Sequence, residues 1–440
     1  MGKKSAAKKI ISHTPQPDKK RFPWHLLVLA IIILEGFCLR MNYIHSDDHE
    51  ILRFFPRSGI GQGNEQLIGW DGVRYDWIAS NFLNGQGFGY KPGQPDSWRP
   101  PGYPFFLIAV YFLFGKDYYT VRVFQVIFST FAILFSYLIA RKVAGRSAGL
   151  ASAAICALYH DAVVFPLIYY SETLFMFLIS GLIYMLMNFS AFDHRGGRLK
   201  WGYPVVIGLI AGYAALVRPI YLLSYPFIAL GLLWYCRDVN LTARKIAVMT
   251  VALLIVLAPW CIRNSYIEGK PTFISTNGGL NLAMGFCENA DGFFLKESQR
   301  FTPEEKQLIA DKGYGAVASR FVLSNPVRTC VLYLKKIRIQ LFEPSARRNI
   351  VRFTGSPIPM PAYYPLTMIL FLGGLTASLF GGRKRFAVLY GYLAGYILMS
   401  AFFFYMGDRH RIPLVPVYAV FGGYIVSVIY RQIKLRIQLG

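Results

Sequence analysis

The sequence has few charged residues, and few of those are acidic. Only 16% of its 440 residues are charged and 54% are hydrophobic, whereas a soluble globular protein carries about 25% charged residues. This shortage excludes an ordinary soluble enzyme. The 23 acidic residues stand against 47 basic ones, a formal net charge of +24, which in a soluble chain would indicate nucleic-acid binding. Here the basic residues form short runs between apolar segments, as in cytoplasmic loops. We therefore expect a polytopic membrane protein without a nucleic-acid partner.

Cysteine is scarce as well, with six residues in the chain. Cys287 and Cys330 share one polar segment, and they either form a disulfide in an oxidising compartment or remain two free thiols. Acidic residues are also rare inside the apolar segments. Glu35 is the exception in the first of them, where a charge costs about 2.5–3.5 kcal/mol on insertion scales. We expect Glu35 to face the interior of the bundle.

Ten apolar segments are near the length of about 20 residues that a membrane-spanning helix needs. They are Phe22–Cys38, 121–140, 148–166, 171–189, 203–217, 220–235, 246–262, 363–380, 387–405 and 413–430. The sequence therefore predicts an all-α bundle of about ten transmembrane helices. The basic tails 1–21 and 431–440 and the basic loops between segments predict that both termini are cytoplasmic. The tail 1–21 is expected to contact anionic membrane lipids.

Two longer polar segments, 41–118 and 263–362, then lie on the outer face, between the bundle helices of 22–262 and 363–430. In the first, Asp71 to Leu83 predicts a short helix, for which Asp71 is either an N-cap or a functional carboxylate. The Pro-rich run Lys91–Pro104 resists regular structure. An amphipathic helix is expected over Tyr103–Gly115. In the second segment, Thr302–Glu305 has the pattern of a helix start with a capping box.

Four short patterns in the first outer segment resemble one known family. They are D-x-x-R-Y-x-x-I-A from Asp71, G-x-G-F from Gly85, R-P-P-G-Y-P from Arg99, and L-F-G ending at Gly115. Together they resemble the first outer loop of the GT-C membrane glycosyltransferases. The similarity is greatest to glycosyltransferase family 39 and its relatives, the protein O-mannosyltransferases and lipid A aminoarabinose transferases. The resemblance implies a GT-C helical bundle in which Asp71 is the catalytic acidic residue.

Later motifs extend this resemblance over most of residues 20–430. Tyr170–Phe175 is similar to the acidic motif at the outer start of a later span, and Ala215–Pro219 to an Arg-Pro at a span end. Pro259–Asn264 with Ser275–Asn281 follows the family's order of elements, and Arg409–Pro413 resembles its late basic segment. The resemblance implies a polyprenyl-phosphate sugar as the donor, with a lipid, glycan or protein as the acceptor.

The donor explains which residue types such a site needs. Its leaving group is a phosphate, which is already ionised at neutral pH and needs cations rather than a general acid. The predicted phosphate-binding residues are basic residues at outer span ends. They are Arg99, Arg218, Arg263, Arg409, His410 and Arg411. Arg99 stands where the aminoarabinose enzymes commonly have Lys, which keeps the charge but changes its shape; a lipid-contacting interface residue is the alternative for Arg99.

The acceptor hydroxyl needs a carboxylate within about 3 Å. Asp71 is the first candidate and Glu172 the second; if the acceptor is itself a phosphate, the carboxylate only positions it. Further substrate-binding candidates are Arg74, Tyr75, Tyr170, Asn277 and Asn281. No cofactor is indicated with certainty. A divalent metal is compatible with the sequence, although Asp47–Glu50 fits a solvated loop better than a metal site.

The sequence thus predicts an inverting glycosyltransferase of a bacterial plasma membrane with its site on the outer face. A lipid or glycan transporter is the first alternative, but it predicts inverted repeats or broken midspan helices, and neither is evident in the sequence. A non-catalytic scaffold of envelope assembly is the second alternative, for which Asp71 would be freely replaceable.

Overall fold

The computed structural model describes residues 23–45, 70–190, 198–293, 297–342 and 360–439. Within these ranges the regular structure is helical, with two isolated β-bridges and no strand. The basic tail 1–21 and the Asp47–Glu50 run lie outside the described residues. The all-α prediction is confirmed for the described part of the chain.

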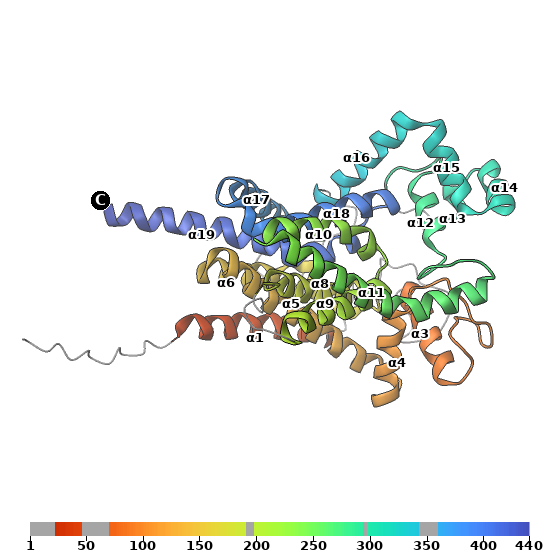
Figure 1. The fold of residues 1–440 in the computed structure, drawn as a ribbon, viewed down its shortest axis with the longest axis horizontal. Helices are drawn as coiled ribbons and strands as arrows, with labels where there is room; N and C mark the ends of the chain where they lie inside the picture. Colours follow the sequence, from red (N-terminus) through yellow and green to blue (C-terminus); the bar gives the residue numbers. More distant parts are fainter. Residues whose placement is uncertain (1–22, 46–69, 191–197, 294–296, 343–359, 440) are drawn as a thin grey trace, which may run out of the picture.

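A bundle of apolar helices forms the body of the molecule, and its axes run roughly along the long dimension (Figure 1). The bundle helices are α1 (Trp24–His45), α5 (Tyr118–Ala144), α6 (Arg146–Leu158), α8 (Ser171–Met187), α9 (Arg198–Val217), α10 (Ile220–Tyr235), α11 (Val239–Glu268), α17 (Met360–Phe380), α18 (Ala387–Phe403) and α19 (Val415–Leu439). Aromatic rings fill much of the space between them; Phe386 and Tyr390, for example, stack on Phe421. Each ring buries a large apolar area, which holds neighbouring helices together.

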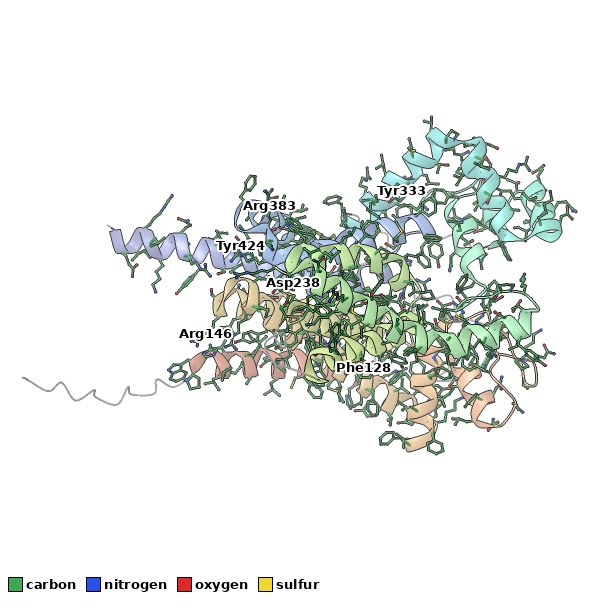
Figure 2. The ribbon with its side chains drawn as sticks, in the orientation of Figure 1. Phe128, Arg146, Asp238, Tyr333, Arg383 and Tyr424 are labelled. Atoms are coloured by element: carbon green, nitrogen blue, oxygen red, sulfur yellow. The ribbon has the colours of Figure 1, made fainter. Side chains whose placement is uncertain are left out.

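Five of the described helices are long and apolar enough to cross a membrane, and a sixth span results if one bent pair is counted. Five further apolar helices of 10–17 residues accompany them. The count of about ten spans therefore stays a prediction. Side chains project from the helices along the whole bundle (Figure 2). Arg146 and Arg383, from two loops predicted to be cytoplasmic, lie toward the end from which α19 projects, and Tyr333 lies toward the other end (Figure 2).

The bent pair is a feature that the sequence pattern did not indicate. The segment 146–167 bends by 63° between α6 and the short helix α7 (His160–Val164), which continues into η2 (Phe165–Leu167). The break frees carbonyl groups at the end of α6, and these need donors inside a membrane protein. Arg40 of α1 supplies these donors: its guanidinium group donates to the carbonyl oxygens of Ala157 at 3.0 Å and Cys156 at 3.3 Å. The segment 148–166, predicted as one span, therefore consists of two helical pieces joined at a bend.

One further sequence prediction is corrected, and one pair of alternatives is decided. Glu35 is exposed on the outer side of α1, whereas Arg40, five residues on and about 140° around the helix, is fully buried. Arg40 donates to the freed carbonyl groups at the end of α6. Cys287 is buried and Cys330 is exposed, and both are free thiols, so the disulfide alternative is not formed.

The shorter helices gather at the end of the bundle opposite the C-terminus (Figure 1). They are α3 (Trp70–Leu83), α4 (Gly102–Phe114), α12 (Gly278–Gly285), α13 (Glu297–Arg300), α14 (Pro303–Lys312), α15 (Tyr314–Ser324) and α16 (Pro326–Phe342). The first two match the helices predicted over 71–83 and 103–115. The capping box at the start of α14 is present, with the Thr302 hydroxyl accepting from the Glu305 amide and the Glu305 carboxylate accepting in return.

Candidate active site

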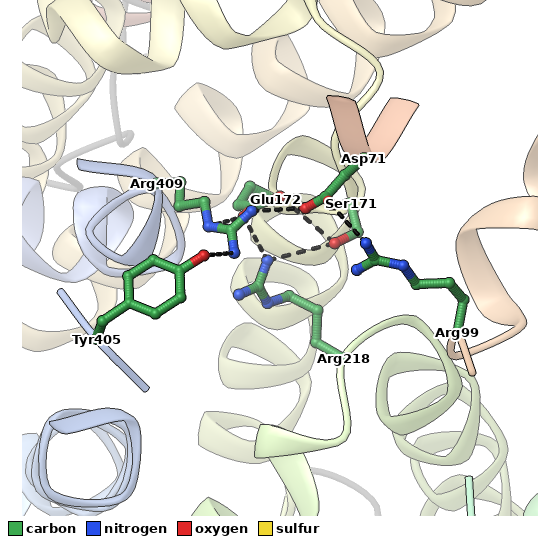
Figure 3. Close-up of polar contacts among 7 residues, drawn as sticks. All are labelled: Asp71, Arg99, Ser171, Glu172, Arg218, Tyr405 and Arg409. Carbon is green, nitrogen blue, oxygen red and sulfur yellow. Dashed lines mark hydrogen bonds and ion pairs between the residues drawn. The ribbon is translucent and has the colours of Figure 1, made fainter. Parts of the chain in front are cut away.

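Five charged side chains from five separate segments meet at this end of the bundle (Figure 3). They are Asp71 in the first turn of α3, Arg99 in the loop before α4, Glu172 in the first turn of α8, Arg218 between α9 and α10, and Arg409 in η4 (Asp408–His410). We call these five residues the arginine–carboxylate cluster. All five were candidates from the sequence, and the fold brings them together across more than 330 residues of chain.

Local backbone features place these residues. The Pro100-Pro101 pair keeps the segment of Arg99 out of α4, which begins at Gly102. A Cβ at Gly102 would lie 2.5 Å from the backbone nitrogen of Val217. Glycine is therefore needed for α4 to approach the end of α9 closely. Since Arg218 follows Val217 directly, this close contact brings the segments of Arg99 and Arg218 together.

The distances within the cluster are those of direct ion pairs. Nη2 of Arg99 donates to Oδ1 of Asp71 at 2.6 Å, and Nη1 of Arg409 donates to Oδ2 of the same carboxylate at 2.7 Å. Arg218 pairs with Oε1 of Glu172 at 2.6 Å. The Nε atom of Arg409 lies 3.8 Å from that Glu172 oxygen. Arg409 therefore bridges the two carboxylates.

The cluster is sheltered from water and carries an excess of one positive charge, from three guanidinium groups and two carboxylates. The Glu172 side chain is 2% exposed and that of Arg218 is 11% exposed. Burial acts to raise the pKa of Asp71, but Arg99 and Arg409 outweigh it and hold that pKa well below its usual range. Asp71 is therefore a carboxylate at any physiological pH. Charges in such a place interact more strongly than in water.

Aromatic side chains surround the arginines. The guanidinium group of Arg99 lies 5.7 Å from the ring centre of Tyr75, and that of Arg409 lies 5.8 Å from the ring of Tyr170. The hydroxyl of Tyr405 accepts a hydrogen bond from Arg409 at 3.0 Å. Tyr75 and Tyr170 were predicted as site residues, whereas Tyr405 was missed. The one feature of the sequence that could have indicated Tyr405 is its position: it is the tyrosine that ends a run of three phenylalanines, four residues before Arg409.

Arg263 lies elsewhere and has another set of partners. It donates to the carbonyl oxygens of Asp96 at 2.6 Å and Phe88 at 2.9 Å, and its guanidinium group lies 4.5 Å from the ring centre of Trp260. These contacts fasten the first outer loop to α11. Arg263 is therefore not part of the arginine–carboxylate cluster, and its role in binding the donor phosphate stays a prediction.

Two neighbours of Arg409 in sequence point away from the cluster. Arg411 donates to the hydroxyl of Tyr364 at 2.9 Å. His410 is buried beside the rings of Phe404 and Tyr405, at 5.2 and 6.1 Å. Burial, together with the charges of nearby arginines, holds the pKa of His410 well below its usual value, so the imidazole is neutral. Of the three consecutive basic residues, Arg409 alone pairs with Asp71.

The remaining candidates, Arg74, Asn277 and Asn281, have other contacts in the structure. Arg74 lies over the ring of Tyr90 at 5.7 Å. The backbone carbonyl of Asn277 accepts from the amide of Asn281 within α12. Just before them the amide of Thr276 donates to the carbonyl of Ser97 at 3.0 Å, which ties this part of the second outer segment to the loop that carries Arg99.

No three His, Cys, Asp or Glu side chains lie together among the described residues in a way that would hold a metal ion. The two carboxylates of the cluster are instead surrounded by guanidinium groups. This set of donors suits an anion better than a cation.

Comparison with known proteins identifies the fold of this chain. Residues 98–262 match the family described as dolichyl-phosphate-mannose-protein mannosyltransferase. The apo crystal structure of the Archaeoglobus fulgidus oligosaccharyltransferase superposes with a TM-score of 0.56 over 94% of this chain, at 14% identity. This chain has the GT-C fold. The resemblance predicted from the sequence is thereby confirmed.

Two further solved structures are similar to this chain. The Archaeoglobus fulgidus oligosaccharyltransferase AglB, in complex with an inhibitory peptide and a dolichol-phosphate, matches 95% of this chain and 51% of its own, with a TM-score of 0.51 and 15% identity. ArnT from Cupriavidus metallidurans, bound to undecaprenyl phosphate, matches 92% of this chain and 78% of its own, with a TM-score of 0.45 and 15% identity. The chain spans about half the length of the oligosaccharyltransferase structures, 52% in the apo form. No curated protein matches it in sequence.

Proposed function

We propose that this GT-C protein is an inverting membrane glycosyltransferase that transfers a sugar from a polyprenyl-phosphate carrier to an acceptor. One observation carries the proposal: three arginines and two carboxylates converge in a sheltered cluster with an excess of positive charge. An anionic donor would complete its charge balance. The AglB structure with dolichol-phosphate supports a carrier of this class.

The arginines would bind and stabilise the phosphate. A guanidinium group has five N–H donors and no acceptor, so Arg99 and Arg409 can each donate to a phosphate oxygen after turning away from Asp71. As the bond between the anomeric carbon and the phosphate oxygen breaks, its electron pair passes to the phosphate. The arginines face the charge that grows there, and one such preorganised donor is worth about 10²–10³ in rate.

Asp71 would act on the acceptor. While both of its oxygens accept from arginines, its low pKa makes it a weak base. When Arg99 and Arg409 turn to the phosphate, the pKa of Asp71 rises toward its usual value and an oxygen becomes free. The acceptor oxygen then bonds to the anomeric carbon and its proton passes to Asp71. This single displacement inverts the sugar; if the acceptor is a phosphate, Asp71 positions it instead.

An assay of sugar transfer by the purified protein reconstituted in liposomes tests this function. The protein would be supplied with polyprenyl-phosphate sugars and with candidate lipid, glycan and peptide acceptors. We expect polyprenyl phosphate to be released together with a glycosylated acceptor of inverted anomeric configuration, measured by mass spectrometry and NMR. Movement of the donor between leaflets without release of its sugar would support the transporter alternative. The break between α6 and α7 does not favour that alternative, because Arg40 already binds the carbonyls it frees.

We further propose that the cluster faces the outside of a bacterial plasma membrane, with both termini in the cytoplasm. Reporter fusions at Lys384 should give a cytoplasmic signal, and fusions at Gln94 and Gln307 should give an outer one. Arg383 of the basic η3 turn (Arg383–Phe386) lies toward the end from which α19 projects (Figure 2), whereas α3 and α14 lie toward the opposite end (Figure 1). Basic loops stay in the cytoplasm. A common signal from Lys384 and Gln94 would contradict this arrangement.

A further inference from the structure

A lysine is buried at the join between the second outer segment and the end of α18. Lys336 of α16 is fully buried, and it forms no ion pair with any carboxylate of the described residues. Its ammonium group lies 3.6 Å from the ring centre of Phe286 and donates to the carbonyl oxygen of Phe404 at 3.2 Å. Burial, with the charge of Arg300 second, lowers its pKa to about 7. Burying a lysine in this way is costly, so its presence calls for a reason.

Two glycines make room for this side chain. A Cβ at Gly285 would lie 2.8 Å from Nζ of Lys336 and 3.3 Å from the Phe404 oxygen. Gly292 has a φ of +94°, and a Cβ there would lie 2.8 Å from Ile339 and 3.6 Å from Cγ of Lys336. A side chain at Gly285 would therefore displace the lysine head, whereas at Gly292 the positive φ itself disfavours any larger residue.

The group that Lys336 holds is the start of the segment that carries Arg409. Phe404 directly follows α18, and the next residue, Tyr405, accepts a hydrogen bond from Arg409. The outer segment holds the same stretch a second time, because the amide of Met406 donates to the carbonyl of Gly292 at 2.7 Å. Residues 404–406 are thus fastened from the second outer segment at two points.

We infer that Lys336 is a positioning residue, which fixes the segment 404–409 so that Arg409 spans Asp71 and Glu172. This inference rests on the proposed function for its effect on transfer, but the placement of the segment can be measured without it. Lysine suits the position because its long side chain reaches the carbonyl oxygen of Phe404 while its amino group lies over the face of Phe286. A displacement of about 1 Å in a catalytic group can cost about 10²-fold in rate.

The first test measures placement alone. Lys336→Met keeps the length and apolar stem of the side chain and removes the donor, and Lys335→Met changes the exposed neighbour on the same helix as a control. We expect hydrogen exchange at the amides of 404–409 to increase in Lys336→Met and to stay unchanged in Lys335→Met. Gly285→Ala, which displaces the ammonium group of Lys336, should have the same effect as Lys336→Met. It serves as the test variant if Lys336→Met does not insert into the membrane. Unchanged exchange in both variants would overturn the inference.

The second test uses transfer. Lys336→Met should lower kcat by about 10- to 100-fold and change KM for the donor little, since Arg409 acts mainly on charge that develops in the reaction. In an Arg409→Ala background the same substitution should cost less than about twofold, because coupled residues are not additive. An equal loss in both backgrounds would overturn the positioning role. If exchange changes as expected but the unaltered protein transfers no sugar, the proposed function fails and the placement by Lys336 stands.

Discussion

Replacing Asp71 with asparagine is expected to lower transfer by about 10³–10⁴-fold while the protein still folds and inserts. Asparagine is nearly the same size and keeps the start of α3, but it is no base, a role worth about 10²–10⁴ in rate. It also removes the negative charge that pairs with both Arg99 and Arg409. The initial rate of polyprenyl phosphate release in liposomes measures the effect.

Asp117→Asn is the matched control for that variant. Asp117 is an outer carboxylate that caps α5 by accepting from the amides of Tyr119 and Thr120, and asparagine caps a helix equally well. We expect its transfer rate to be unchanged. Normal turnover in Asp71→Asn would instead assign the base to Glu172, and loss of activity in both variants would indicate a general effect on folding.

The same substitution has a pH signature in stability. The pKa of Asp71 is lower in the folded protein than in an unfolded chain, so its pairing stabilises the fold above the unfolded pKa, about 3.9. That contribution is lost as the pH falls through the folded value. The thermal stability of Asp71→Asn should therefore be below that of the unaltered protein at neutral pH, and the difference should shrink only in strong acid.

Arg409→Ala is expected to lower transfer by about 10²–10³-fold, the cost of one preorganised donor. The variant also removes the cation that bridges Asp71 and Glu172. The pairs Arg99–Asp71 and Arg218–Glu172 remain, but nothing links them. Arg409→Lys should recover only a small part, because a point charge does not reach both carboxylates as the planar guanidinium group does.

The control for Arg409 is Arg328→Ala. Arg328 lies on the second outer segment and pairs with Glu288 at 2.6 Å, but both side chains are about half exposed. Exposed pairs of this kind contribute about 0–1 kcal/mol, so we expect normal transfer. A loss in Arg328→Ala equal to that in Arg409→Ala would mean that any arginine on this face matters, and the special role of Arg409 would fall.

Short-range features of this protein were predictable because they depend on neighbouring residues. The helices over 71–83 and 103–115 follow from apolar spacing and from the Gly and Pro residues that end them. The capping box at Thr302 follows from the side chains of one helical turn. The low charged fraction alone indicated a membrane bundle, because a bilayer excludes charge whatever the order of the helices.

The partners of long side chains were not predictable in the same way. Arg263 and Arg409 both stand at outer span ends and look alike in the sequence. Arg263 meets the carbonyls of Phe88 and Asp96, whereas Arg409 meets Asp71, 338 residues away. Likewise Arg40, rather than Glu35, faces the bundle, because the break after α6 places carbonyls there that need donors.

The sequence by itself therefore determined that this is a membrane protein, where most of its helices lie, and which motif residues resemble the GT-C family. Only the tertiary structure decided which of its basic residues form the site and which fasten the scaffold, and it alone revealed Tyr405 and Lys336. The physical reason is that apolar spacing and helix capping depend on residues only a few positions apart. The partner of an arginine or lysine side chain depends instead on which carboxylate or carbonyl group the packed helices bring within about 3 Å of it.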